Sequence, residues 1–166
     1  LHAALQANEP LAKAYYRYEA ENEGVLVAYA SIHGGTAEAA NLIGEKLRQM
    51  GCPKVGVSDL SRDDIAEVIE DAFRYPRPVC CAASYDANVF PPMHDFLWHL
   101  QIKNYQNRRI ALLENGSWAP CAGKAMKALI EPMKNITLID PVVTIRSRMK
   151  QTDVPAIEQL CRDILA

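Results

Sequence analysis

Residues 25–36 constrain this chain more than any other stretch. An apolar run of strand length leads through a short loop of small and hydroxyl residues, with Gly34 and Gly35, directly into an alanine-rich segment from Ala37. A helix that begins after such a turn has backbone N–H groups without intrahelical acceptors, and its dipole adds partial positive charge there. The stretch therefore predicts a phosphate site between a buried strand and a helix.

Composition narrows the class of protein. The 166 residues fit one domain, and 49% hydrophobic with 23% charged residues is typical of a globular protein. A net charge of −2 favours neither nucleic acid nor an anionic membrane as a partner, and no apolar stretch is long enough to span a bilayer. Five cysteines, with no CxxC spacing, indicate reduced thiols and hence a cytoplasmic location.

Strand-like and helix-like segments alternate five times along the chain. The strands are expected at 25–30, 54–60, 78–83, 109–114 and, interrupted by Asp140-Pro141, 136–145. The helices are expected at 36–50, after an N-cap at Ser61, at 93–103, 121–133 and 154–165. This alternation predicts an α/β three-layer sandwich, with a five-stranded parallel sheet in the order 2-1-3-4-5. Residues 1–23, with a short helix over 11–19, form a leader to the domain at 24–166.

Three non-repetitive loops follow the carboxyl ends of the first, third and fourth strands, at residues 30–36, 84–92 and 115–120. Ligands of parallel α/β sheets bind beyond the carboxyl ends of the strands, where the strand order reverses. In the order 2-1-3-4-5 all three loops meet at that point. We therefore expect one binding site that is built from these loops.

The first loop could bind a phosphate group through uncharged hydrogen-bond donors. Ser31 and Thr36 offer hydroxyl groups, and the two glycines allow close backbone approach. The loop lacks the lysine of a Walker motif and the spacing of a dinucleotide fingerprint. Binding would then depend on amide donors and the helix dipole, which suits a terminal monophosphate. The alternative is an ordinary strand-to-helix turn with Thr36 as N-cap.

The other two loops contain what a flat aromatic ligand needs. Tyr85 and Trp118 can stack on a planar ring, a contact that contributes roughly 0.5–1.5 kcal/mol beyond area burial. Polar groups that could read the ring edge belong to Asp86, Asn88, Asn115 and Ser117. The alternative is that Tyr85 and Trp118 are loop anchors that pack on the protein itself.

These motifs resemble a known family. Residues 31–36, Ser-Ile-His-Gly-Gly-Thr, resemble the Ser/Thr-x-x-Gly-x-Thr phosphate loop of flavodoxins, and residues 24–166 resemble the flavodoxin-like domain of the flavodiiron proteins. Residues 84–92 match that family in length, in the Tyr and in Phe-Pro-Pro, but have Asp86 where Asn is usual. Residues 116–118 are similar to its Gly-Ser-x-Gly-Trp segment, although shorter before the Trp. The tyrosine-rich leader looks like the segment that joins the family's two domains.

The resemblance implies a flavodoxin-like fold that holds FMN noncovalently and transfers electrons. The implied acceptor is a metallo-β-lactamase-like diiron domain, of the same or a neighbouring chain, that reduces oxygen or nitric oxide. The implied donor is a rubredoxin or an NAD(P)H oxidoreductase, and a homo-oligomer is possible. The histidines show no metal-ligand pattern, so we expect an electron carrier without catalytic or metal-binding residues of its own. The cofactor-binding residues are then Ser31, Ile32, His33, Gly34, Gly35, Thr36, Ser84, Tyr85, Asp86, Ala87, Asn88, Phe90, Asn115, Gly116, Ser117 and Trp118.

Two other functions stay open at this point. One is a stand-alone flavin-dependent quinone or NAD(P)H reductase, which would oxidise NAD(P)H directly. The other is a docking or oligomerisation domain that keeps the fold while its flavin site is eroded. Asp86 and the shortened third loop are the features that keep this last alternative open.

Overall fold

The computed structural model of the chain describes residues 7–8 and 18–166. The helix expected over residues 11–19 falls mainly on residues outside this part of the chain, and residues 18 and 19 are not helical. No helix in the described ranges has both the length and the apolar character needed to cross a lipid bilayer.

One parallel sheet runs through the middle of the domain. Its strands are β1 (Val25–Ala30), β2 (Val55–Asp59), β3 (Arg77–Tyr85), β5 (Arg108–Asn115), β6 (Ile136–Leu138) and β7 (Val143–Ile145). Their order is β2-β1-β3-β5-β6, and β7 also pairs with β5. The fifth strand position is therefore shared: β6 pairs with the first half of β5 and β7 with the second. The predicted order 2-1-3-4-5 is confirmed.

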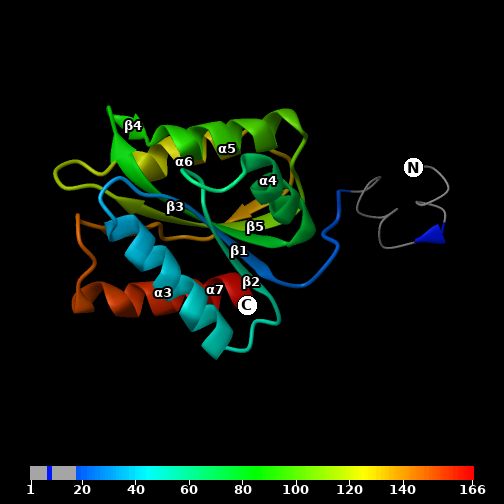
Figure 1. The fold of residues 1–166 in the computed structure, drawn as a ribbon, viewed down its shortest axis with the longest axis horizontal. Helices are drawn as coiled ribbons and strands as arrows, with labels where there is room; N and C mark the ends of the chain where they lie inside the picture. The colour runs from blue at the N-terminus through cyan, green and yellow to red at the C-terminus, as the bar shows by residue number, and fades with distance from the viewer. Residues whose placement is uncertain (1–6, 9–17) are drawn as a thin grey trace.

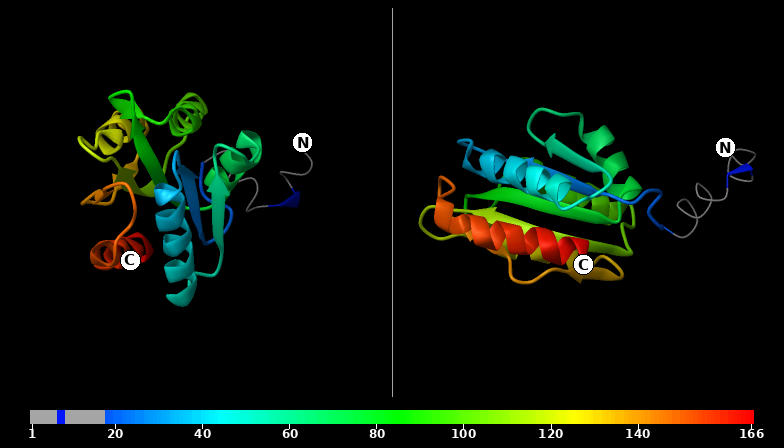
Figure 2. Two further views of the ribbon diagram at one scale, coloured as in Figure 1. Left: turned by 60° about the vertical axis from the view of Figure 1, so that its left-hand side comes forward. Right: turned by 90° about the horizontal axis from the view of Figure 1, so that it is seen from below.

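Helices cover both faces of this sheet, as Figures 1 and 2 show. They are α3 (Gly35–Gln49), α4 (Ile65–Arg74), α5 (Pro91–Ile102), α6 (Ala122–Ile130) and α7 (Val154–Leu165), the last preceded by the 3₁₀ turn η1 (Gln151–Asp153). In β1, Val25 and Val27 face α3 and α7, whereas Leu26 and Ala28 face the other three helices. Both faces of the strand are buried, which explains its continuous apolar run.

Two local predictions were wrong. The helix expected to begin at Ser61 instead takes Asp64 as N-cap, whose Oδ1 accepts a hydrogen bond from Ala66 N at 2.9 Å. The amide of Ser61 donates to Asp59 Oδ1 at 2.9 Å, so residues 59–63 form a turn before the helix. The segment 84–92 is also not an irregular loop. β3 continues to Tyr85 and turns back into the short strand β4 (Asn88–Val89), while α5 begins at Pro91, where proline suits a first helical turn.

The residues that lead into β1 are attached to the amino end of the sheet. The buried Arg108 donates from Nη1 to the carbonyl oxygen of Tyr18 at 2.6 Å. The amides of Glu21 and Asn22 donate to the carbonyl oxygen of Arg74 at 3.0 and 3.1 Å. Residues 18–22 are therefore bound to the domain at the end of the sheet opposite to the loops that follow the strands.

Candidate functional site

The loop after β1 leaves the N-terminus of α3 open. Gly34 is the N-cap, with φ +94°, and its amide donates to Ser31 Oγ at 3.1 Å. No side chain caps the helix, so the first amides of α3 point beyond its end without an intrahelical acceptor. Thr36 lies inside the helix and is 1% exposed, and its Oγ1 accepts from Asn115 Nδ2 at 3.3 Å. The alternative of Thr36 as N-cap was therefore wrong.

The N-terminus of α6, at the same edge of the sheet, is filled by the protein itself. Ser84 Oγ, from β3, accepts hydrogen bonds from the amides of Cys121 and Ala122 at 2.9 and 3.1 Å. Glu114 Oε2, from β5, accepts from the amide of Gly123 at 2.7 Å. The fold thus satisfies the donors of α6 and leaves those of α3 free for an external anion.

Asn115 joins the start of α3 to the segment that follows β7. Its side-chain amide donates to the carbonyl oxygen of Ser147 and accepts from the Ser147 amide, both at 2.8 Å. Ser147 has φ +63°, and its Oγ lies 2.6 Å from Ser117 Oγ. A Cβ at Gly35 would overlap the Ser147 carbonyl oxygen, so only glycine permits this close approach.

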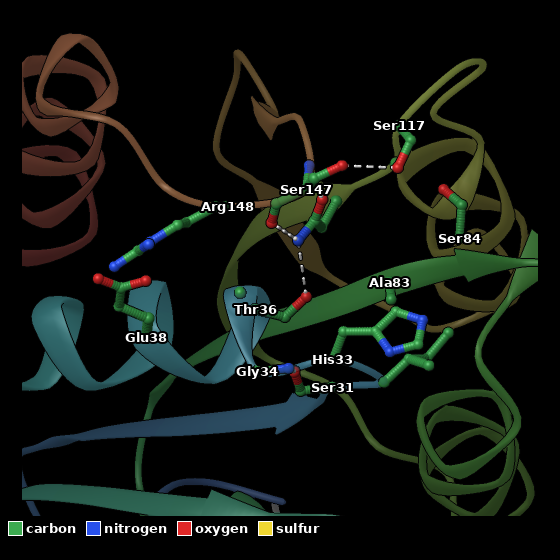
Figure 3. A pocket seen from close by; sticks show the side chains of 14 residues that line it. Ser31, His33, Gly34, Thr36, Glu38, Ala83, Ser84, Ser117, Ser147 and Arg148 are labelled. Atoms are coloured by element: carbon green, nitrogen blue, oxygen red, sulfur yellow. Dashed lines mark hydrogen bonds between the residues drawn. The ribbon is translucent and has the colours of Figure 1, made fainter.

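These elements line a half-open cavity of about 690 Å³ (Figure 3). It is lined by Ser31, Ile32, His33, Gly34, Gly35, Thr36, Glu38, Ala83, Ser84, Asn115, Gly116, Ser117, Ser147 and Arg148. A neighbouring hollow of about 480 Å³ is lined by Ser84, Tyr85, Asp86, Ala87, Gly116, Ser117, Trp118, Ala119 and Cys121. Ser84, Gly116 and Ser117 line both, so the two hollows adjoin one another.

The structure brings most of the sequence-predicted residues into these two hollows. The whole loop 31–36 lies in the larger one, and Tyr85 and Trp118 line the smaller one with 45% and 94% of their surface exposed. Asn88 and Phe90 line neither. The Asn88 side chain accepts from the Val89 amide at 2.7 Å, and the Phe90 ring packs against Tyr85 at a centroid distance of 5.7 Å.

Sequence reasoning missed the segment that follows β7. Ser147 and Arg148 line the larger hollow although neither belongs to the three loops that we identified. The rule that ligands lie beyond strand ends applies to the fifth strand position as well, so this signal was present in the sequence. Glu38, Ala83 and Ala119 also line the hollows, although none was named as a cofactor-binding residue from the sequence.

Arginines of that segment supply the positive charge that loop 31–36 lacks. Arg146 donates from Nη1 to the carbonyl oxygens of Ser117 and Trp118 at 3.5 and 3.4 Å, which steadies the loop before the tryptophan. Arg148 lines the cavity itself. Within the described residues, no group of three or more histidine, cysteine, aspartate or glutamate side chains is placed to hold a metal ion.

The fold and this site at the carboxyl edge of the sheet define an α/β protein of flavodoxin-like fold. The chain is similar to the rubredoxin oxygen:oxidoreductase of Desulfovibrio gigas, with a TM-score of 0.82 and 15% identity over 92% of this chain and 38% of that one. It is similar to the flavodiiron protein of Giardia intestinalis, with a TM-score of 0.78 and 12% identity over 94% of this chain and 38% of that one. An archaeal flavodoxin matches with a TM-score of 0.73 and 22% identity, over 86% of this chain and 96% of the flavodoxin.

The chain thus spans 38% of the length of the first two proteins and almost all of the flavodoxin's. At these identities the likeness establishes the fold. No family model and no curated protein matches the sequence.

Proposed function

We propose that residues 24–166 form an FMN-binding electron-transfer domain. The observation that carries this proposal is the open N-terminus of α3, whose cavity adjoins a second hollow flanked by the exposed rings of Tyr85 and Trp118. A nearly fully exposed tryptophan beside a cavity favours an aromatic ligand. Each hollow has the size of an ordinary small-molecule site.

The residues fit both ends of FMN. The amides at the start of α3, with the Ser31 hydroxyl, would hold the phosphate group, and Gly35 gives the backbone its close approach there. Tyr85 and Trp118 would flank the ring system, with Ser84 and Ser117 between the two ends. Bound FMN would supply one- and two-electron redox chemistry, which the protein tunes by orientation and nearby charge.

The partner is a proposal of its own. We propose that the domain delivers electrons to a metallo-β-lactamase-like diiron domain and receives them from a rubredoxin or an NAD(P)H oxidoreductase, in the cytoplasm. The likeness to a rubredoxin oxygen:oxidoreductase and a flavodiiron protein, each much longer than this chain, supports this assignment. The two alternatives, a stand-alone reductase and a docking domain with an eroded site, are not favoured by these comparisons.

Titration with FMN tests the function. The purified chain should quench flavin fluorescence and shift the visible flavin absorption bands, with saturation at one FMN per chain. The ring positions should be tested with Tyr85→Ala and the control Tyr18→Ala, a half-buried tyrosine outside both hollows, of which only the first should weaken FMN binding. A chain that takes up no FMN from micromolar solution overturns the proposal. Direct NADH or NADPH oxidation by the flavin-loaded chain would favour the reductase instead.

A further inference from the structure

Arg148 is a cation at the edge of the larger cavity. It follows Ser147, which Asn115 holds against the start of α3, and it lines the cavity together with loop 31–36. Within the described residues no hydrogen bond or ion pair engages its guanidinium. Its neighbour Arg146 differs, because its guanidinium donates to carbonyl oxygens of residues 117 and 118.

Glu38 lies in the first turn of α3 and lines the same cavity. Figure 3 shows the Arg148 side chain extending from its segment toward the Glu38 carboxylate. A carboxylate in this turn interacts favourably with the helix dipole as long as no other anion is present. An anion at the end of α3 would instead be repelled by Glu38 and attracted by Arg148.

The charge of a phosphate monoester decides how much this cation matters. Such a group carries about −1.5 to −2 at pH 7. A helix N-terminus offers only about +0.5. The helix dipole therefore leaves about 1 to 1.5 units of negative charge uncompensated. Loop 31–36 contains no lysine or arginine. Among the described residues that line the cavity, Arg148 is therefore the one lysine or arginine, beside the imidazole of His33.

We propose that Arg148 is a specificity-determining residue, which makes the site prefer a flavin that carries a terminal phosphate dianion over the same flavin without it. Glu38 opposes this preference by competing for the guanidinium. The inference rests on the proposed flavin function. It adds that the charge of Arg148, at the phosphate end of the site, determines which flavin binds more tightly.

The test compares FMN with riboflavin, which has the same ring system and no phosphate. Dissociation constants are measured by fluorescence quenching for the wild type and for Arg148→Gln, Arg148→Lys and Glu38→Gln. Lys124→Gln, at an exposed position of α6 outside both hollows, is the matched control for net charge. Thermal melting of each variant shows that it is folded.

We expect Arg148→Gln to weaken FMN binding about five- to tenfold, in line with the loss of a charge-assisted hydrogen bond at an exposed site, and to leave riboflavin unchanged. Arg148→Lys should retain part of the preference, Glu38→Gln should strengthen FMN binding alone, and Lys124→Gln should change neither ligand. An unchanged ratio of the two dissociation constants in Arg148→Gln overturns the inference and leaves the proposed function standing. A wild type that binds neither flavin overturns both.

Discussion

The side-chain amide of Asn115 pairs with the backbone of Ser147 through two hydrogen bonds of 2.8 Å, one donated and one accepted. It also donates to Thr36 Oγ1 inside α3. Asn115 is 8% exposed and its bond to Thr36 is buried, whereas the two bonds to the exposed Ser147 are partly buried. One buried side chain thus joins the end of β5, the start of α3 and the segment that contains Arg148.

Replacement of Asn115 by alanine should therefore loosen the phosphate end of the site. The backbone groups of Ser147 lose their partners, and we expect a loss of about 1–3 kcal/mol in the free energy of unfolding. FMN affinity should fall with it, measured by urea denaturation and flavin titration. Asn41→Ala, which removes a hydrogen bond to Ala37 O on the exposed side of the same helix, is the control and should cost less than 1 kcal/mol. Equal losses in the two variants would contradict the assigned role.

Gly35→Ala should abolish or strongly weaken FMN binding. The new Cβ meets the carbonyl oxygen of Ser147, a backbone atom that Asn115 holds in place, so the start of α3 has to move away. Gly51→Ala is the matched control. Gly51 has φ +87° with open space around its Cβ position, so alanine there costs about 1 kcal/mol of stability and leaves binding intact. Flavin titration of both variants checks this prediction. A loss of FMN affinity in Gly51→Ala as large as that in Gly35→Ala would refute it.

Trp118→Ala should weaken the binding of FMN and of riboflavin by the same factor, because the ring system is common to both ligands. The lost stacking contributes roughly 0.5–1.5 kcal/mol, which is a few-fold to about tenfold in the dissociation constant. Stability should not change, since the side chain is 94% exposed. Trp98→Ala, on α5 and outside both hollows, is the control and should leave both affinities unaltered. A weaker FMN affinity with unchanged riboflavin binding would argue against stacking on Trp118.

Asp86→Asn should make the bound flavin easier to reduce. Asp86 lines the hollow assigned to the ring, and its carboxylate disfavours extra negative charge there. Because the side chain is exposed, we expect a rise of only about 10–30 mV in the midpoint potential, and less at high salt. Spectroelectrochemical titration measures the shift, with Glu67→Gln on α4 as the remote control. A fall in potential would show that Asp86 acts otherwise than by charge.

Stability should decline at alkaline pH because of the buried thiols. Burial raises the pKa of Cys80 to about 12 and that of Cys81 well above its ordinary value. Above about pH 9 the unfolded chain releases these protons while the folded chain keeps them, so unfolding becomes easier as pH rises toward the folded-state pKa. Urea denaturation at pH 8 and pH 10 should show this decline, and a smaller one in Cys80→Ala. The same decline in both proteins would contradict the prediction.

Much of the architecture could be predicted from the sequence because each element is marked locally. Apolar strands buried on both faces and helices with one apolar stripe give clear patterns, and α7 begins and ends at the expected residues 154 and 165. The N-cap was wrongly predicted at Ser61 because serine is a common N-cap residue. In the structure the Ser61 amide donates to the Asp59 carboxylate, so Ser61 belongs to the turn before the helix. Such competition between neighbouring acceptors depends on tertiary geometry that residue types do not reveal.

The candidate site was predictable where a loop directly follows a strand and not where distant segments meet. Loop 31–36 shows its glycines and hydroxyls in one run. Arg148 lies more than a hundred residues away, and only the pairing of β7 with β5 and the Asn115 clamp bring it to the cavity. The capping of α6 by Ser84 was equally hidden, because that hydroxyl looks in the sequence like a ligand donor.

The attachment of Tyr18 to Arg108 has a practical consequence for anyone who labels or tethers this molecule. Arg108 opens β5 and Asn115 closes it, so seven residue steps of about 3.3 Å, or about 23 Å, separate the attachment point from the cavity. A fluorophore, affinity handle or surface linker attached before residue 18 would therefore join the domain at the end of the sheet remote from the cavity. Immobilisation through that end should present the candidate site to solution, ready for an electrode or a reaction partner.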